Sequence, residues 1–217
     1  MDFSTIVFIL EMIGTVAFAV SGVIVARDCK MDVFGAVVLG CATAVGGGAV
    51  RDLILGITPP MMFRKPVYVL VAALASLVTF YLELGGSRLH QLLIERHPER
   101  NEQLLNIADS VGLAAFVVVG CRTAIDSGYG ENLFLCAFIG VLTGIGGGIL
   151  RDVLAGQMPL IMRKRVYGLA AIIGSVVYCG LLSVSVSVIP SSLACIAVTC
   201  LIRFLAIHYR WNLPSFH

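Results

Sequence analysis

The chain has 217 residues, of which 59% are hydrophobic and 13% are charged, and its mean hydropathy is +0.97. Soluble domains have about 45–50% apolar and about 25% charged residues, so this composition excludes an ordinary water-soluble fold and predicts an integral membrane protein with one membrane domain over residues 1–217. The net charge of +2 and the dispersed basic residues exclude a nucleic-acid-binding surface.

Three apolar segments of spanning length come first in the chain. A membrane-crossing helix needs about 17–25 apolar residues, and polar interruptions delimit expected spans over 5–26 and 67–84. Between them, the segment 33–63 stays apolar except at Arg51 and Asp52. This segment is longer than one straight span requires, and it contains three consecutive glycines.

A hydrophilic stretch and four more spans follow. We expect a solvated connector over 85–106, because it carries many charges of both signs, with a helical piece over 87–95. The later spans are expected over 107–124, from 133 to the basic cluster at 163–165, from 166 to the Pro-Ser-Ser sequence at 190–192, and over about 190–208.

The chain contains an internal repeat. The sequence GGGAVRD at 46–52 returns as GGGILRD at 146–152. Further pairs match at the same positions of the two copies: Glu11 with Asp109, Gly14 with Gly112, Phe18 with Phe116, Gly22 with Gly120, and Tyr68 with Tyr167. Each copy therefore holds three spans, with repeat one over about 4–84 and repeat two over about 107–188.

An odd number of spans in each copy fixes the topology. The second copy enters the membrane from the opposite side, so the predicted fold is an all-α membrane protein with an inverted 3+3 repeat and a seventh helix. Basic residues concentrate on the cytoplasmic side, which places the N-terminus outside and the C-terminus in the cytoplasm. The other side has Arg64, Lys65 and Arg122, whereas the predicted cytoplasmic side has Arg27, Lys30, Arg88, Arg96, Arg100, Arg163, Lys164, Arg165, Arg203 and Arg210.

The glycine triplets, Gly46-Gly47-Gly48 and Gly146-Gly147-Gly148, have two interpretations. Small residues at every fourth position let helices pack closely, but that ridge does not require Gly46, Gly47, Gly146 or Gly147. Three glycines in a row instead favour a kink or an unwound turn that frees backbone groups toward a cavity. We therefore predict that the second and fifth helices are broken at the triplets.

Each triplet is followed by an arginine and an aspartate inside an apolar run: Arg51 and Asp52, then Arg151 and Asp152. One interpretation makes them interfacial anchors. Ionisable residues at membrane depth, however, usually face the bundle interior or an aqueous path. Because adjacent helical side chains point about 100° apart, Arg51 and Asp52 need not pair with each other, and the expected partners across the pseudo-two-fold axis are Glu11 and Asp109.

These charges also predict an ion preference. Four acids, Glu11, Asp52, Asp109 and Asp152, accompany only two arginines, so a cavity lined by all of them favours cations. Thr43 and Thr143 are the expected hydroxyl ligands on the same two helices.

Two basic clusters flank spans, Arg64-Lys65 and Arg163-Lys164-Arg165. Such clusters serve as topology determinants, and the alternative interpretation is that they bind anionic lipid headgroups. The histidines and cysteines have no metal-ligand spacing, and the chain has no phosphate-binding loop or nucleophile elbow. We therefore expect no catalytic residue, no metal, no cofactor and no soluble partner.

The doubled Gly-Gly-Gly-x-x-Arg-Asp motif, three spans deep in each copy and followed by a seventh span, resembles the prokaryotic trimeric intracellular cation (TRIC) channels. That family is also catalogued under a glycine-transporter domain. The resemblance implies a homotrimer in the inner membrane of a prokaryote, with a potassium-permeable pore in each subunit. It also implies that the glycine triplets flank the pore and that Arg51 and Arg151 are the motif arginines.

Two functions remain open at this point. The preferred hypothesis is a potassium-favouring channel whose path runs between the broken helices. The alternative is a secondary transporter of a small amino acid such as glycine, because inverted repeats with interrupted helices serve both.

Overall fold

The computed structural model describes residues 3–85, 98–163, 166–209 and 211, and within these residues it is all-helical. Seven helices of the described chain are long and apolar enough to cross a membrane, which confirms the predicted fold class. They are α1 (Phe3–Asp28), α2 (Val33–Ile54), α4 (Val67–Gly85), α6 (Pro98–Ala124), α7 (Leu133–Leu154), α9 (Val166–Ser183) and α10 (Val188–His208). Three short pieces join them, α3 (Met61–Arg64), the π-helical turn η1 (Ile125–Tyr129) and α8 (Leu160–Arg163).

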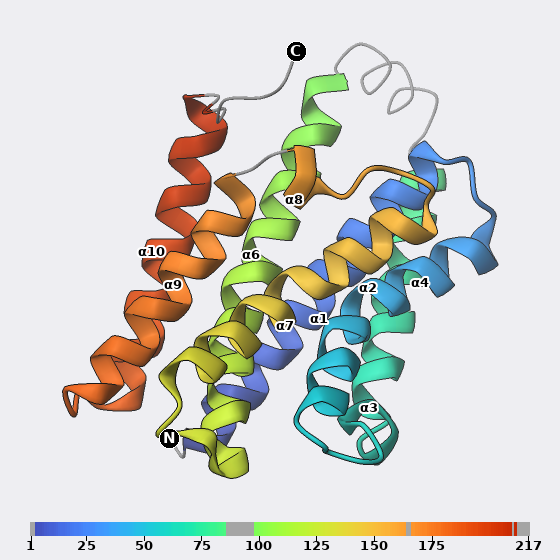
Figure 1. Ribbon diagram of the computed structural model, residues 1–217. Helices are drawn as coiled ribbons and strands as arrows, with labels where there is room; N and C mark the ends of the chain where they lie inside the picture. The colour runs from blue at the N-terminus through green and yellow to red at the C-terminus, as the bar shows by residue number, and fades with distance from the viewer. Residues whose placement is uncertain (1–2, 86–97, 164–165, 210, 212–217) are drawn as a thin grey trace.

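The two copies of the repeat are inverted in space. Helices α1 to α4 form one copy and α6 to α9 the other, and α3 lies at the lower end of the bundle whereas α8 lies near the upper end (Figure 1). Helix α1 begins at the lower end and α10 ends at the upper end (Figure 1). An odd number of crossings in each copy produces this arrangement.

Matched residues define both ends of α2 and α7. Asp32 and Asn132 precede the helices, and each side chain accepts a backbone N–H of the first turn, at 2.8 and 3.0 Å. At the other ends, Gly56 and Gly156 have φ angles of 71° and 67°, in the left-handed region that glycine adopts without strain. The chain therefore turns directly into the short helices α3 and α8.

The predicted breaks at the glycine triplets are wrong. Helices α2 and α7 run as uninterrupted α-helices through residues 46–48 and 146–148. The glycines instead allow close approach: a Cβ atom on Gly47 would lie 2.5 Å from the carbonyl oxygen of Thr143, and one on Gly147 would collide with the carbonyl oxygen of Thr43. The inter-repeat contact is thus made backbone to backbone.

The ridge of small residues at every fourth position faces other helices than the contact between α2 and α7. A Cβ atom on Gly40 would collide with Ser76 of α4, and one on Gly140 would collide with Cys121 of α6. The ridge therefore packs α2 and α7 within their own repeats. The off-ridge glycines face the other repeat, which is why the helical ridge alone did not explain them.

Two helix starts differ from expectation. Helix α6 begins at Pro98, inside the expected connector, and the predicted helical piece over 87–95 lies outside the described residues. Helix α10 begins at Val188, so Pro190 lies in its first turn, where a missing N–H removes no intrahelical bond. The break between the last two spans is therefore at 184–187 rather than at 190–192.

Candidate functional site

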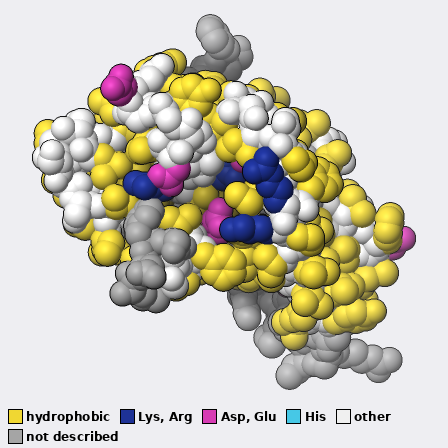
Figure 2. Space-filling model, turned by 90° about the horizontal axis from the view of Figure 1, so that it is seen from below, with side chains coloured by type: hydrophobic (Ala, Val, Ile, Leu, Met, Phe, Trp, Pro, Cys, Tyr) yellow, Lys and Arg dark blue, Asp and Glu magenta, His cyan; other side chains and the backbone are white. Residues whose placement is uncertain are grey.

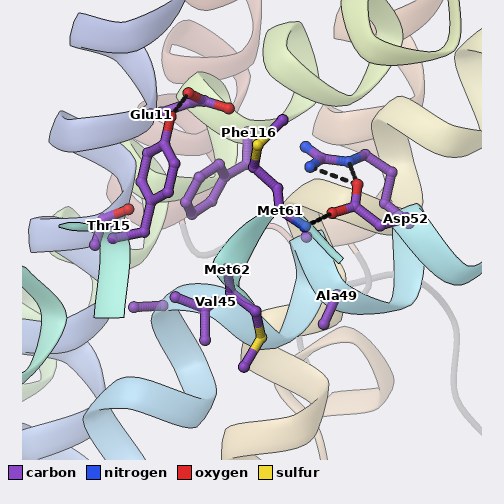
Figure 3. Close-up of a pocket in the computed structure, with 12 residues that line it drawn as sticks. Glu11, Thr15, Val45, Ala49, Asp52, Met61, Met62 and Phe116 are labelled. Atoms are coloured by element: carbon purple, nitrogen blue, oxygen red, sulfur yellow. Dashed lines mark hydrogen bonds and ion pairs between the residues drawn. The ribbon is translucent and has the colours of Figure 1, made fainter. Parts of the chain in front are cut away.

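A polar pocket opens at the end of the bundle where α3 lies. Figure 2 looks onto this end and shows basic and acidic side chains around a central hollow framed by hydrophobic ones. The cavity has a volume of about 40 Å³, room for a few water molecules, and its walls come from α1, α2, α3, α4 and α6. Its lining residues are Glu11, Thr15, Ala44, Val45, Gly48, Ala49, Arg51, Asp52, Met61, Met62, Tyr68 and Phe116 (Figure 3).

Glu11 of α1 is the acid of this pocket that forms no ion pair with any side chain in the described part of the chain. Its carboxylate accepts a hydrogen bond from the hydroxyl of Tyr68, a residue of α4 that also lines the pocket. Glu11 and Arg51 do not form an ion pair, although both side chains line the same cavity. The Glu11 carboxyl group therefore faces the pocket with a tyrosine hydroxyl as its hydrogen-bond partner.

Arg51 pairs with the residue beside it. Its Nη2 and Nε atoms lie 2.7 and 2.8 Å from Oδ1 of Asp52, and both side chains are buried. The other carboxylate oxygen, Oδ2, accepts the backbone N–H of Met61 at 2.7 Å, at the start of α3 (Figure 3). Helical spacing did not require these adjacent residues to pair, but they do, because the long arginine side chain folds back over the aspartate.

Repeat two has the same bonds at matched positions. Arg151 Nε lies 2.8 Å from Oδ1 of Asp152, and Oδ2 of Asp152 accepts the N–H of Leu160 at 2.7 Å. In both copies the aspartate therefore joins the end of a long helix to the start of a short one. This explains why an acid follows the arginine in each motif.

Arg151 also has a second acidic partner. Its Nη1 atom lies 2.7 Å from Oδ1 of Asp109 and 2.9 Å from Oγ of Ser21, and the Arg151 and Asp109 side chains are both 0% exposed. Asp109 is one of the two acids expected as partners of the arginines, but this pair lies within repeat two rather than across the pseudo-two-fold axis. A buried ion pair of this kind resists removal of either partner, since the remaining charge would be left unpaired.

Arg203 of α10 adds another charge to this cluster. It is only 2% exposed, its Nε donates to Oγ of Ser110 at 3.0 Å, and its guanidinium carbon lies 4.8 Å from the ring centre of Tyr167. Arg203 is therefore a buried residue of the helix bundle rather than an exposed charge. The position of Arg203 in an apolar span was the signal that could have identified it as a buried charge. In the same way, the match of Tyr68 with Tyr167 between the two copies could have identified these tyrosines as site residues.

The two threonines lie away from the pocket. The hydroxyls of Thr43 and Thr143 donate to the carbonyl oxygens of Leu39 and Ile139, each at 2.6 Å, and both residues are buried. Gly22 and Gly120 pack against these hydroxyls. The two threonines therefore lie in the contacts between α1 and α2 and between α6 and α7. Their role as ion ligands stays a prediction.

The glycines of the two triplets also have separate places. Gly48 lines the pocket, and Gly148 lies beside the Arg151 cluster. Gly46 faces Leu150 of the other repeat, and Gly146 approaches the backbone of Gly47. The triplets therefore lie between the pocket and the buried cluster.

Only part of the two basic clusters is described. Arg64 and Lys65 are exposed at the pocket end, and Arg64 donates to the carbonyl oxygen of Thr58 at 2.7 Å. Arg163 ends α8, and Lys164 and Arg165 lie outside the described residues. Binding of lipid headgroups stays a prediction. Among the described residues, no group of three or more His, Cys, Asp or Glu side chains has a metal-binding arrangement.

Comparisons with known proteins agree with this geometry. The sequence profile of the family described as glycine transporter matches residues 8–83 and 106–183. The UPF0126 inner membrane protein YadS of Escherichia coli (strain K12) is 38% identical over 213 residues, which cover 97% of this chain and 96% of YadS.

Solved structures give the same result. The TRIC trimeric intracellular cation channel orthologue from Rhodobacter sphaeroides matches with a TM-score of 0.84 and 32% identity, over 95% of this chain and 100% of that chain. A second structure, described as showing the basis for conductance through TRIC cation channels, matches with a TM-score of 0.81 and 34% identity, over 100% of this chain and 98% of that one. Neither is described as an enzyme. The resemblance that the repeated motif indicated is confirmed.

Proposed function

This chain belongs to the glycine-transporter family and is a homologue of the TRIC channels, and from that premise we propose that it is a monovalent cation channel that favours potassium. The observation that carries the proposal is the pocket in which Glu11 faces a water-sized cavity at one end of the bundle. A carboxylate in such a cavity attracts cations and repels anions.

The proposed path follows the seam between the two repeats in each subunit. It starts in the pocket at Gly48, passes the contact between Gly47 and Gly147, and leaves beside Gly148 at the opposite end. Since α2 and α7 touch backbone to backbone at Gly47 and Gly147, the path is closed at its middle in this structure. Conduction requires these two helices to separate.

The proposed basis of cation preference is narrower than the four acids of the sequence. Asp52 and Asp152 are each paired with the neighbouring arginine and hold a backbone N–H. Asp109 shares Arg151 with Asp152 and is fully buried outside the pocket, whereas Glu11 lines it. Glu11 is thus the acid that acts on a passing ion.

We place the protein in the inner membrane of a prokaryote as a homotrimer with one path in each subunit. The relatives' descriptions as an inner membrane protein and a trimeric channel support this. With Arg203 inside the bundle, basic residues still favour a cytoplasmic α8 end, so the pocket opens to the outside.

A bilayer recording with potassium on one side and sodium on the other tests the proposal. A channel of the proposed kind gives unitary currents whose reversal potential lies on the potassium-selective side of zero. A reversal potential at zero would contradict potassium preference.

One observation favours a second function. Glu11 and Arg51 face the same cavity with opposite charges, as needed to hold the ammonium and carboxylate groups of a small amino acid. Uptake of labelled glycine against its gradient by proteoliposomes, driven by a coupling ion, would support this transporter function.

A further inference from the structure

Two phenylalanines at matched positions of the repeat meet where the two copies join. Phe18 of α1 and Phe116 of α6 are 98 residues apart in the sequence, as Glu11 and Asp109 are. Their ring centres lie 5.2 Å apart and the ring planes are inclined at 60°, a favourable geometry for an aromatic pair. Phe18 is fully buried, and Phe116 is 8% exposed. The two repeats are therefore joined by a contact between equivalent side chains.

Each ring is seated by a glycine of the other copy. A Cβ atom on Gly112 of repeat two would collide with the ring of Phe18, and one on Gly14 of repeat one would lie 3.0 Å from the ring of Phe116. A side chain at either glycine would therefore press on the opposite ring. This exchange explains the Gly-x-x-x-Phe spacing that the two copies share at 14–18 and 112–116, which the charged residues do not explain.

The two rings lie between the charged groups of the two ends. On α1, Phe18 follows Glu11 by about two turns and precedes Ser21 by about one. On α6, which runs in the opposite direction, Phe116 follows Asp109 by about two turns (Figure 1). Glu11 lines the pocket, whereas Ser21 and Asp109 belong to the buried arginine cluster at the α8 end. A route along the contact between α1 and α6 therefore passes both rings.

The pocket ends at this aromatic pair. Phe116 lines the cavity together with Glu11 (Figure 3), and Phe18 packs against Phe116 without lining the cavity. Phe18 also reaches α7, since a Cβ atom on Gly147 would lie 2.9 Å from its ring. An apolar constriction of this kind expels water and so excludes ions. The other buried residues of the same cluster are also apolar: Ala19, Ala44, Ala72 and Val119.

We propose that Phe18 and Phe116 form the hydrophobic barrier of the path and determine how readily a cation crosses from the pocket toward the α8 end. When α2 and α7 separate at Gly47 and Gly147, the two rings move apart and water becomes continuous past them. The passage of a cation rests on the proposed function, whereas the exclusion of water by the rings does not.

Substitutions at Phe116 test the barrier in planar-bilayer recordings. Phe116→Ser removes the ring and adds a hydroxyl group, whereas Phe116→Leu keeps an apolar side chain. Phe80→Ser is the matched control, because Phe80 also pairs with an aromatic neighbour, Tyr81, at 5.7 Å between ring centres. Phe80 lies at the other end of α4 from the pocket residue Tyr68 and packs in a separate apolar cluster.

We expect Phe116→Ser to raise the mean potassium current per channel about tenfold, because burying an aromatic side chain is worth a factor of about ten or more in an equilibrium. Phe116→Leu and Phe80→Ser should leave that current within a factor of about two of the wild type, since neither wets the constriction.

Gly14→Ala is a second variant whose expected effect has the opposite sign. Its methyl group would confine the ring of Phe116, and overpacking of this kind costs enough to shift an equilibrium by a factor of about ten. The mean potassium current should therefore fall about tenfold. This variant keeps the barrier testable even where Phe116→Ser does not fold.

A thiol reporter tests the exclusion of water without any current. Ser21→Cys, in a chain whose seven native cysteines are replaced, places a thiol on the α8 side of the rings. Silver ion is added to sealed vesicles from the pocket side, where it can form a silver thiolate and release the thiol proton. Protection of the cysteine from maleimide after unfolding gives the reaction rate. We expect Phe116→Ser to raise this rate about tenfold, and Phe116→Leu and Phe80→Ser to leave it unchanged.

Three results would overturn the proposal. If the wild type conducts, an unchanged current in both Phe116→Ser and Gly14→Ala would show that the ring does not limit permeation. An equal rise in Phe80→Ser would show general loosening of the bundle. Equal silver rates with and without the Phe116 ring would show that the ring excludes no water. Absence of any wild-type current would refute the channel function instead, and the silver rates would still decide the barrier.

Discussion

At the scale of single residues, the same motif performs different work in the two repeats. Each aspartate bonds its neighbouring arginine and the start of a short helix, whereas only Arg151 has an additional acid, Asp109. Glu11, the mate of Asp109, bonds a tyrosine hydroxyl instead. Asp109 therefore stabilises the fold, whereas Glu11 lines the cavity.

This difference predicts the effect of Glu11→Gln on selectivity. Removing the unneutralised charge should lower the potassium-to-chloride permeability ratio by roughly a factor of ten, equivalent to about 1.4 kcal/mol of attraction. The ratio follows from reversal potentials in a potassium chloride gradient. Tyr68→Phe removes only the hydrogen bond and should keep the preference. A common loss of selectivity in both variants would argue against the charge of Glu11 as its source.

The same difference predicts the stability of matched variants. Asp109→Asn leaves Arg151 short of one partner in a fully buried site, and breaking such a pair costs about 3–5 kcal/mol. Glu11→Gln weakens one hydrogen bond, worth about 1 kcal/mol. Thermal unfolding in detergent should therefore show a much larger fall in Tm for Asp109→Asn. A similar decrease in Tm for both variants would mean that Asp109 and Glu11 contribute equally to stability.

At the scale of the elements, the contact between α2 and α7 depends on two glycines. A Cβ atom on Gly47 would press on the carbonyl oxygen of Thr143, whereas one on Gly48 would meet its nearest side-chain atom, of Arg51, at 3.7 Å. Adjacent residues of one triplet therefore differ in purpose. Gly47 sets the distance between the repeats, and Gly48 leaves space in the cavity.

Alanine substitutions at these two positions make a matched test. Gly47→Ala should destabilise the protein by about 1–3 kcal/mol through overpacking, despite the better helix propensity of alanine. Gly48→Ala should be neutral or stabilising by up to about 1 kcal/mol. Urea-dependent unfolding in mixed micelles measures both. Equal effects would contradict the close backbone contact as the reason for the glycines.

At the scale of the whole molecule, the sequence predicted the span count and the inversion because hydropathy and an odd repeat determine both. It did not predict that α2 and α7 stay helical, since three glycines permit an unwound turn and a close contact equally. The pairing of Arg51 with Asp52 depends on how a long side chain folds back, which helical spacing does not determine. The burial of Arg203 depends on where α10 docks, a contact without a repeat mate.

Unitary current in a potassium chloride gradient is the measurement that tests the channel function most directly. Purified protein in a planar bilayer should give single-channel currents that reverse near the potassium equilibrium potential, and Glu11→Gln should move the reversal toward zero. Saturable uptake of labelled glycine in the absence of any such current would contradict the channel and establish the transporter in its place.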